Sequence, residues 1–222
     1  MRHELYGELL GKYVKDGMVQ YKGFKNEEKK LDKYLQLLDH TNPDTLPRNE
    51  QFAFYLNAYN AYTIKLILTH YPGIQSIKDI ESWLTSPWKK NFCKIGGHTY
   101  SLDEIEHGIL RPRFKDPRVH FAINCASKGC PPLISKPYQG SILDQQLDER
   151  TRAFINNPER NRLEGNTLYV SEIFKWFEED FKEGVVDFFS HYAQGELRKL
   201  LLTKGEHIKV NYLNYDWSLN EL

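Results

Sequence analysis

The 222-residue chain lacks several features that mark common classes of protein. It contains no run of about 18 apolar residues, so we expect no membrane-spanning segment. It contains neither a phosphate-binding loop nor a dinucleotide fingerprint, which makes nucleotide chemistry less favoured. Its 30 basic and 30 acidic residues cancel, so no excess of positive charge points to nucleic acid or an anionic membrane surface as a partner.

Cysteine is scarce as well. The three cysteines do not form a disulfide scaffold, although one bridge between Cys125 and Cys130, with Cys93 left free, is sterically possible. The first residues, MRHELYGELLGKYV, lack the apolar segment of a signal peptide and are expected to begin the folded domain. Cysteine usage does not settle the compartment, and a periplasmic or secreted location is favoured if a signal sequence once preceded this chain.

The residues that are abundant indicate one helix-rich domain. Aromatic residues make up 14% of the chain and no repeat or Gly/Ser linker interrupts it, so we expect a single α+β domain over residues 1–222. We expect a small, mostly antiparallel sheet and a buried central helix. Helices are predicted at residues 4–13, 27–38, 47–70, 101–111, 144–156, 171–181, 184–192 and 195–202. Strands are predicted in hairpins at 91–102 and 161–170, and singly at 119–125 and 207–217.

The helix predicted over residues 47–70 is apolar around nearly its whole circumference, which is typical of a buried helix. Asn57 and Asn60 lie three residues apart on one side of it, and buried amides need hydrogen-bond partners. One interpretation is a structural network that ties the helix to a loop. The other is catalytic, with one asparagine orienting a catalytic side chain or donating a hydrogen bond to an oxyanion.

The stretch SLDEIEHGILR begins with Ser101 and Glu104 in the pattern of a helix capping box. On a helical wheel Glu106 falls within the apolar stripe, where a carboxylate is costly unless it is paired or protonated. His107 lies roughly 100° further round the helix. Glu106 is therefore either one half of a buried salt bridge with a following arginine, or an acid that orients the imidazole of His107.

The stretch HFAINCASKGCPPL, residues 120–133, places a cysteine at the end of an apolar run. In the strand predicted over residues 119–125, Cys125 and His120 point to opposite faces. This alternation argues against His120 as the base for Cys125 and favours His107, which comes from another element. The loop that follows offers Lys128 and free backbone N–H groups, which lower the pKa of a nearby thiol.

Four interpretations of Cys125 stay open. It is a small core residue, one half of a disulfide with Cys130, a metal ligand, or a thiol nucleophile. A metal site lacks a fourth ligand and the usual Cys-x2-Cys spacing, so we expect neither a metal nor another cofactor. The nucleophile is favoured because the chain offers a base and several orienting groups, namely His107 with Glu106, Asp103, Asn57 or Asn60.

Several stretches together resemble the family named domain of unknown function 547. They are FYLNAYNAYTIKLIL, YSLDEIEHGILRPRF, DPRVHFAINCASKGCPPL, LYVSEIFKWFEEDF and YDWSLNEL. The resemblance covers residues 5–222 and implies no established reaction, substrate or cofactor. It implies that bacterial relatives are often exported, and that others join this domain to coiled-coil, glutaredoxin-like or signalling segments. The residues that match the family's motifs are Asn57, Asn60, Glu106, His107, Arg111, Cys125, Pro131, Asp216 and Trp217.

The sequence leads to two functional hypotheses. The first is a cysteine-dependent hydrolase or acyltransferase that acts on a peptide, amide or related acyl bond, with roles similar to those in papain and transglutaminases and a fold of that type as one expectation. Its expected catalytic residues are Cys125, His107, Glu106, Asn60 and Asn57, and its expected substrate-binding residues are Arg111, Ser127 and Lys128. The second hypothesis is a non-catalytic module that binds a peptide or a cell-envelope component. In both, the partner is an unknown peptide or small molecule.

Overall fold

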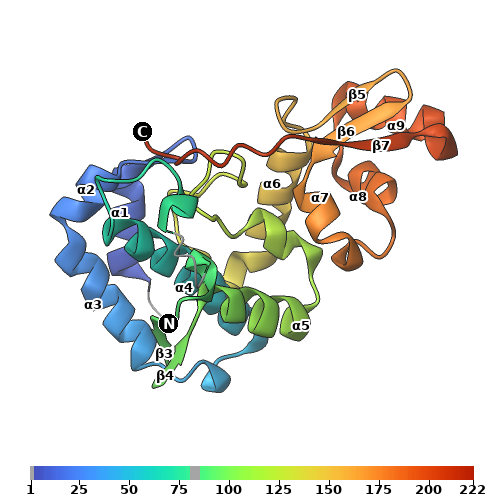
Figure 1. The fold of residues 1–222 in the computed structure, drawn as a ribbon. Coiled ribbons are helices and arrows are strands. Elements are labelled where there is room, and N and C mark those ends of the chain that lie inside the picture. The colour runs from blue at the N-terminus through green and yellow to red at the C-terminus, as the bar shows by residue number, and fades with distance from the viewer. Residues whose placement is uncertain (1–2, 81–85) are drawn as a thin grey trace.

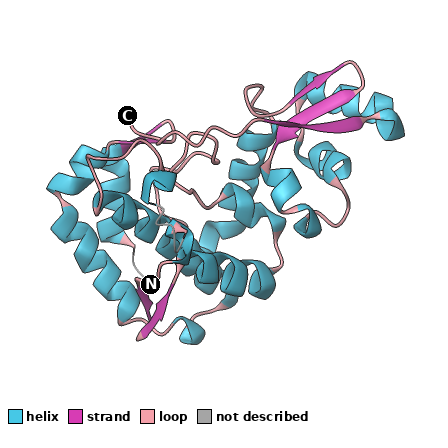
Figure 2. Cartoon of the chain, viewed as in Figure 1, coloured by secondary structure: helices cyan, strands magenta, loops and turns pink. Residues whose placement is uncertain are grey.

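The computed structural model of the chain describes residues 3–80 and 86–222. Helices predominate in these residues and the strands are short (Figure 1, Figure 2). The helix-rich α+β domain predicted from the sequence is therefore confirmed. Two clusters of buried apolar side chains stabilise it, and the chain passes between them more than once.

The helices and strands of the described residues have the following bounds. The α-helices are α1 (Glu4–Tyr13), α2 (Tyr21–Asn26), α3 (Glu28–Asp39), α4 (Arg48–Leu68), α5 (Arg111–Phe114), α6 (Leu143–Ile155), α7 (Ile173–Trp176), α8 (Val185–Tyr192) and α9 (Gly195–Lys204). The shorter helical turns are η1 (Pro43–Thr45), η2 (Ile77–Ile80), η3 (Pro87–Lys89), the π-helix η4 (Glu104–Leu110), η5 (Pro117–Phe121), η6 (Gly140–Ile142), η7 (Glu178–Asp180) and η8 (Gly205–His207). The strands are β1 (Val14–Lys15), β2 (Met18–Val19), β3 (Cys93–Ile95), β4 (His98–Tyr100), β5 (Arg162–Glu164), β6 (Thr167–Ser171) and β7 (Lys209–Leu213).

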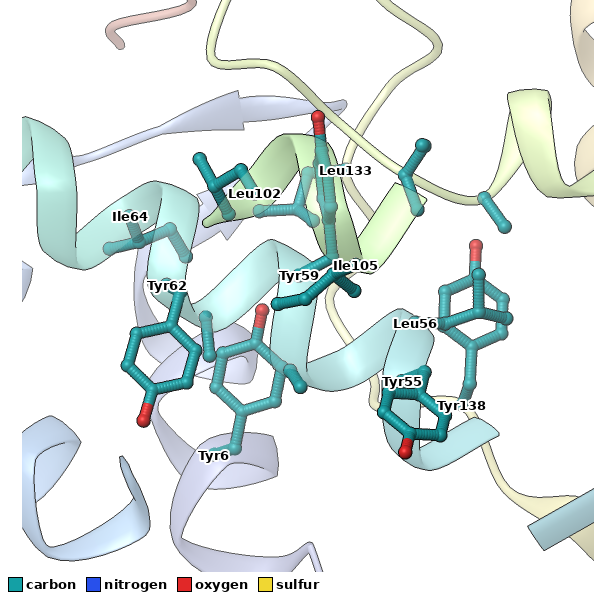
Figure 3. Close-up of a cluster of buried hydrophobic side chains, with 14 of the residues drawn as sticks. Tyr6, Tyr55, Leu56, Tyr59, Tyr62, Ile64, Leu102, Ile105, Leu133 and Tyr138 are labelled. Atoms are coloured by element: carbon teal, nitrogen blue, oxygen red, sulfur yellow. The ribbon is translucent and has the colours of Figure 1, made fainter. Parts of the chain in front are cut away.

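Helix α4 lies at the centre of the larger cluster, which we call the N-terminal core (Figure 3). Between residues 51 and 68 every side chain except that of Lys65 is buried, because α2, α3, η4 and η6 pack around the helix. Lys65 forms ion pairs with Glu28 and Asp32 of α3 at 2.7 and 2.6 Å. The buried central helix is confirmed, and at about 1.5–3 kcal/mol for each fully buried large side chain it contributes a large share of the stabilisation.

The second cluster, which we call the C-terminal core, is rich in phenylalanine. It lies at one end of the molecule, and most of its residues belong to the part of the chain coloured orange to red, with Phe121, Phe154 and Ile155 added from earlier in the sequence (Figure 1). The ring of Phe174 contacts four others, those of Phe121, Phe181, Phe188 and Phe189. The continuous helix predicted over residues 171–181 is wrong, because Phe177 leaves helical geometry between α7 and η7 and stacks its ring on His120 instead.

The strands form small separate sheets. β1 pairs with β2 and β3 with β4 as antiparallel hairpins, whereas β6 pairs antiparallel with β5 and parallel with β7. The hairpins predicted at 91–102 and 161–170 are therefore confirmed. The last strand is shorter than the predicted 207–217, since pairing with β6 ends at Leu213.

The strand predicted over residues 119–125 is wrong. Residues 117–121 form the turn η5, and the side chain of Asp116 caps this turn by accepting a hydrogen bond from the Arg118 N–H at 3.0 Å. The apolar residues of this stretch serve two different cores, because Val119 is buried in the N-terminal core and Phe121 in the C-terminal core. A strand with one apolar face cannot supply both.

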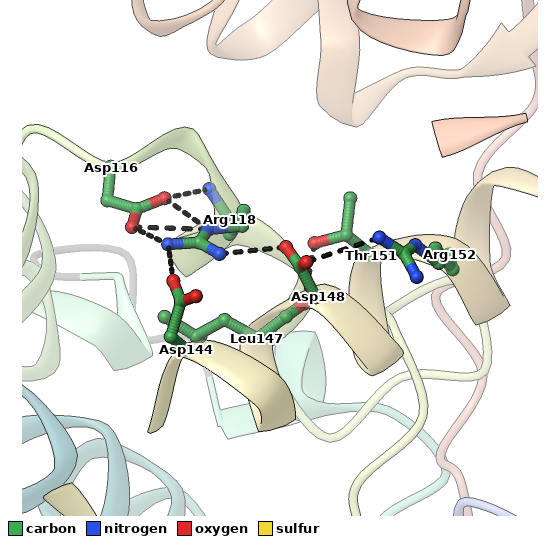
Figure 4. Close-up of polar contacts among 7 residues, drawn as sticks. All are labelled: Asp116, Arg118, Asp144, Leu147, Asp148, Thr151 and Arg152. Carbon is green, nitrogen blue, oxygen red and sulfur yellow. Dashed lines mark hydrogen bonds and ion pairs between the residues drawn. The ribbon is translucent and has the colours of Figure 1, made fainter. Parts of the chain in front are cut away.

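An ion-pair network holds η5 against helix α6 (Figure 4). The guanidinium of Arg118 lies 2.8 Å from carboxylate oxygens of Asp116, Asp144 and Asp148. Asp144 and Asp148 are one helical turn apart on α6, so a planar guanidinium reaches both while it also binds the residue that caps its own turn. This network fixes the backbone immediately before His120.

The last residues, 214–222, return from β7 to the N-terminal core (Figure 1). We call them the C-terminal strap. Bridges pair Ser127 with Leu219 and Val19 with Glu221. The side chain of Asn220 accepts a hydrogen bond from the Tyr21 hydroxyl at 2.7 Å, and it donates one to Asn124 at 3.2 Å. The strap therefore links both cores to the loop that follows Asn124.

Candidate functional site

A pocket of about 250 Å³ opens where residues of both cores meet. Its ionisable and sulfur-containing groups are Asp103, Glu106, His107, His120, Cys125 and Cys130. Besides Tyr59, five aromatic residues line it, and we call them the aromatic wall: Trp88, Trp176, Phe177, Tyr215 and Trp217. The ring of Trp217 is central to this wall, with centroids 5.8 Å from Trp88, 5.6 Å from Trp176 and 4.6 Å from Tyr215.

Cys125 and Cys130 form a disulfide, with their Cα atoms 6.2 Å apart. The bridge that the sequence allowed is therefore present, and Cys93 is the free cysteine. Burial raises the pKa of the Cys93 thiol, which makes it unreactive. The Sγ atom of Cys125 also lies 3.2 Å from the Ser127 hydroxyl and 3.3 Å from the Tyr215 hydroxyl.

The side chains of Asn57 and Asn60 on α4 form hydrogen bonds with backbone groups, not with a catalytic side chain. Asn60 accepts a hydrogen bond from the Asn124 N–H at 2.8 Å and donates one to the carbonyl of Ala122 at 3.0 Å. Asn57 makes the same pair of bonds with the backbone of Tyr138, both at 2.8 Å. The structural interpretation of both residues fits these contacts, and Asn60 in addition fixes the segment that leads to Cys125.

The loop after Cys125 has little free backbone. The N–H groups of Ala126, Lys128 and Gly129 donate to Asn124, Ser218 and Asp216 at 2.8 Å in each case. These three N–H groups are therefore not free, contrary to the expectation from the sequence, because the Asn124 side chain and the C-terminal strap accept their hydrogen bonds. Ala126 has a φ of 63°, a left-handed conformation that costs a non-glycine residue roughly 1 kcal/mol or more.

His120 lines the same pocket as Cys125, so the strand-based argument that placed them on opposite faces is wrong. Its side chain is buried, and its Nε2–H donates to Asp180 Oδ2 at 2.7 Å. Despite partial burial, hydrogen bonds from His120 and Arg111 hold the pKa of Asp180 well below its usual range, so Asp180 is an acceptor. Burial lowers the pKa of His120, and its Nδ1 atom has no hydrogen-bond partner. A neutral His120 therefore keeps a free lone pair at Nδ1.

His107 has the opposite arrangement. Arg111 can only donate, so the 2.7 Å contact between its guanidinium and Nδ1 makes that nitrogen of His107 an acceptor. Partial burial lowers the pKa of His107, and the neutral ring then has its proton on Nε2, 3.9 Å from Asp103. His107 thus offers an N–H donor rather than a basic lone pair.

Glu106 is buried in the pocket, as the helical wheel predicted. Burial raises its pKa to about 7, against the opposing effects of a hydrogen bond from Tyr59 and the charge of Arg111. The capping box that begins its helix is also present, since the Ser101 N–H donates to Glu104 at 2.7 Å and the Glu104 N–H donates to Ser101 at 3.1 Å. A carboxyl group with this pKa exchanges a proton near neutral pH.

The three predicted substrate-binding residues are placed differently from one another. Ser127 is buried with its hydroxyl against the Cys125 sulfur. Arg111 forms ion pairs with Asp180 and Glu179 and a hydrogen bond with His107. It therefore contacts His107 directly and His120 through Asp180. Lys128 is exposed and does not line the pocket.

Sequence reasoning missed Asp180, Tyr215 and the role of Trp176. The stretch LYVSEIFKWFEEDF contains Trp176 and Asp180, and YDWSLNEL begins with Tyr215. Neither stretch has a local pattern that indicates a contact with the site around Cys125. Among the described residues no group of three or more His, Cys, Asp or Glu side chains is arranged to hold a metal ion. No helix in the described part of the chain is long and apolar enough to cross a bilayer.

The fold and the pocket together define an α+β protein with a cysteine, histidine and carboxyl site. Residues 43–155, just over half of the chain, match the family described as "Protein of unknown function, DUF547", and the chain belongs to this family. No curated protein and no solved structure matches it, so a papain- or transglutaminase-like fold stays a prediction. The matched segment contains Glu106, His107, His120 and Cys125, but the groups that complete the pocket from residue 173 onward lie outside it.

Proposed function

We propose that the pocket is the catalytic site of a cysteine-dependent hydrolase or acyltransferase that acts on a peptide, amide or related acyl bond. One observation supports this most strongly. A buried histidine is oriented by a carboxylate through one nitrogen and leaves the other without a partner, in the pocket that contains a cysteine. A nucleophile, a base and a group that orients the base are the three parts that thiol catalysis needs.

In the proposed reaction Nδ1 of His120 takes the proton of the Cys125 thiol, and the thiolate attacks the acyl carbon. The tetrahedral intermediate collapses, the bond to the leaving amine or alcohol breaks, and the leaving group takes the proton from His120. Water or a second amine then attacks the thioester, and the Cys125 sulfur leaves and is protonated again. Asp180 holds the tautomer of His120 that this cycle requires.

Two further groups have proposed roles. The hydroxyls of Tyr215 and Ser127 lie against the Cys125 sulfur, so they are near an oxyanion that develops on the attacked carbon. Glu106, with a pKa of about 7, is the proposed second acid–base group. The base role that the sequence gave to His107 moves to His120, and His107 becomes a hydrogen-bond donor.

The proposal requires the dithiol form of the protein. An external dithiol attacks the Cys125–Cys130 bridge, a mixed disulfide forms and one cysteine thiolate leaves. The second thiol of the reductant then closes its own disulfide and releases the other cysteine, so two electrons pass to the protein and each sulfur gains a proton. Cys125 is more exposed than Cys130, which favours attack at Cys125.

The bridge itself favours the alternative, a non-catalytic module that binds a peptide or a cell-envelope component. A cysteine that stays bridged has no thiolate and cannot be a nucleophile. On this alternative His120, Asp180 and Arg111 are a structural ion-pair cluster.

Cysteine alkylation distinguishes the two functions. Iodoacetamide labelling of Cys125 is followed by mass spectrometry from pH 5 to 9, in gently reduced wild type and in Cys130→Ser, which removes the bridge but not the base. We expect half-maximal reactivity well below the ordinary thiol pKa of about 8.5. His120→Ala raises this midpoint towards the ordinary value, whereas His107→Ala changes it little. A Cys130→Ser protein with an ordinary Cys125 pKa that His120→Ala leaves unchanged would exclude the catalytic proposal.

A further inference from the structure

The charges that line the pocket are of one sign. Among the described residues that line it there is no lysine or arginine, whereas the carboxyl groups of Asp103 and Glu106 are both present. The two imidazoles, His107 and His120, have lowered pKa values and are neutral near pH 7. The described residues that line the pocket therefore offer an anionic ligand no positive side chain.

The aromatic wall supplies the remaining surface. Three of the chain's four tryptophans, Trp88, Trp176 and Trp217, belong to it. The electron-rich faces of indole rings attract cations, and several rings with nearby carboxylates form a typical receptor for ammonium groups. A pocket of about 250 Å³ is small, and it suits a group about as large as one amino-acid side chain.

Cations of the protein already bind two of these rings. The ammonium of Lys78 lies 3.8 Å from the centroid of Trp217, and the guanidinium of Arg111 lies 5.2 Å from that of Phe177. Both cations come from outside the set of residues that line the pocket. One face of each of these two rings is therefore occupied by a cation of the protein itself, which shows that the rings attract positive charge and leaves Trp88, Trp176 and Tyr215 as the rings without such a contact among the described residues.

We propose that the pocket binds an organic cation, an alkylammonium group, between the aromatic wall and the carboxyl groups of Asp103 and Glu106. If the cation is part of the substrate, the proposal rests on the proposed function, because the bound cation then places the acyl bond of the substrate at Cys125. Binding of the cation itself is expected in the bridged and the reduced protein alike.

Quenching of tryptophan fluorescence tests the binding with three probes of similar shape. They are choline, its uncharged analogue with carbon in place of the nitrogen, and pivalate as an anion. We expect choline to bind about 10-fold more tightly than the uncharged analogue, which is the usual size of a cation–aromatic effect in a partly desolvated site, and pivalate not to bind. Equal binding of choline and the uncharged analogue overturns the proposal, since it shows an apolar site without preference for charge.

Two variants locate the effect. Trp176 is 43% exposed, so Trp176→Leu removes a ring of the wall at little cost to folding and is expected to weaken choline binding several-fold. Tyr212→Leu is the matched control, because Lys175 lies over this ring at 5.8 Å outside the pocket, and it leaves choline binding unchanged. Equal loss in both variants, or none in Trp176→Leu, places the cation elsewhere and overturns the assignment.

The two proposals fail separately. If choline does not bind, while His120→Ala still raises the pH of Cys125 alkylation, the cation is wrong and the catalytic cysteine stands. If choline binds as expected, while Cys125 shows an ordinary thiol pKa in every variant, the pocket is a cation-binding site of the non-catalytic module.

Discussion

Two parts of the chain contribute to the pocket in different ways. The segment between α4 and α6, which lies within the residues that match the family, contains the groups with proposed chemical roles, Glu106, His120 and Cys125. The C-terminal part of the chain supplies what orients and encloses them, namely Asp180, the ring of Phe177 and most of the aromatic wall. Neither part forms the pocket alone, and in the proposed function reactivity and selection of the ligand belong to different parts of the sequence.

The largest effect is expected at the proposed base. His120→Ala in the reduced protein is expected to slow acyl transfer from a p-nitrophenyl ester by about 10²–10⁴-fold, because Arg111 occupies the lone pair of His107, the other histidine among the described residues that line the pocket. His107→Ala is the control and loses less than about 10-fold. Stopped-flow absorbance gives both rates. Equal losses in the two variants would return the base role to His107 and contradict the assignment.

The next effect tests whether the C-terminal part is needed for chemistry. Asp180→Asn is expected to slow the same reaction by about 10²-fold or more, because an amide in place of the carboxylate stabilises the wrong tautomer of His120. Glu179→Gln is the matched neighbour, since Glu179 also pairs with Arg111 but is 77% exposed, and it is expected to keep the rate within about 2-fold. An Asp180→Asn protein with the rate of wild type would confine the catalytic groups to the N-terminal part.

A third prediction concerns the stability of the N-terminal part. Because burial raises the pKa of Glu106 from 4.5 to about 7, the folded protein binds this proton more tightly than the unfolded chain. The resulting stabilisation is complete below pH 4.5 and is lost as the pH rises through 7, a change of about 3 kcal/mol. Glu106→Gln removes this dependence.

Urea unfolding at two pH values measures that change. At pH 8 the Glu106→Gln protein is expected to be more stable than wild type by up to about 3 kcal/mol, and at pH 4 to be nearly equal to it. A variant that is less stable than wild type at pH 8 would show that the carboxylate stabilises the fold through a partner, and would make Glu106 a structural residue.

The smallest effect separates two asparagines of one helix. Asn57→Ala and Asn60→Ala each leave two backbone groups unpaired, so each is expected to cost about 1–3 kcal/mol in urea unfolding. Only Asn60 holds the segment before Cys125, so only its loss slows alkylation of the reduced cysteine, by several-fold. Equal alkylation rates in the two variants would mean that α4 does not position the nucleophile.

Local patterns in the sequence were sufficient for much of the N-terminal part. The apolar circumference of residues 47–70, the capping box at Ser101 and the inward direction of Glu106 each follow from periodicity over one or two helical turns. The stretch 119–125 was not predictable in this way. Val119 and Phe121 are both buried, as in a strand, but they are buried in different cores.

The site was less predictable than the fold because its partners are distant in the sequence. Asp180 lies 60 residues after His120, and Tyr215 lies 90 residues after Cys125. No periodicity connects positions so far apart, and the strand predicted over residues 119–125, which is wrong, places His120 on the face opposite Cys125. The spacing of Cys125 and Cys130 showed that a disulfide was possible, because a separation of five residues allows few geometries. Spacing alone could not decide between a bridge and a free thiol.

The C-terminal strap also sets the order in which the site is assembled during protein synthesis. Residues 215–220 contact Cys125, Ser127 and Asn124 from the far end of the sequence, so these contacts form only after the strap has left the ribosome. Until then the segment that contains Cys125 lacks the hydroxyl of Tyr215 and the ring of Trp217. The pocket is therefore complete only when the last residues of the strap have joined the segment that contains Cys125.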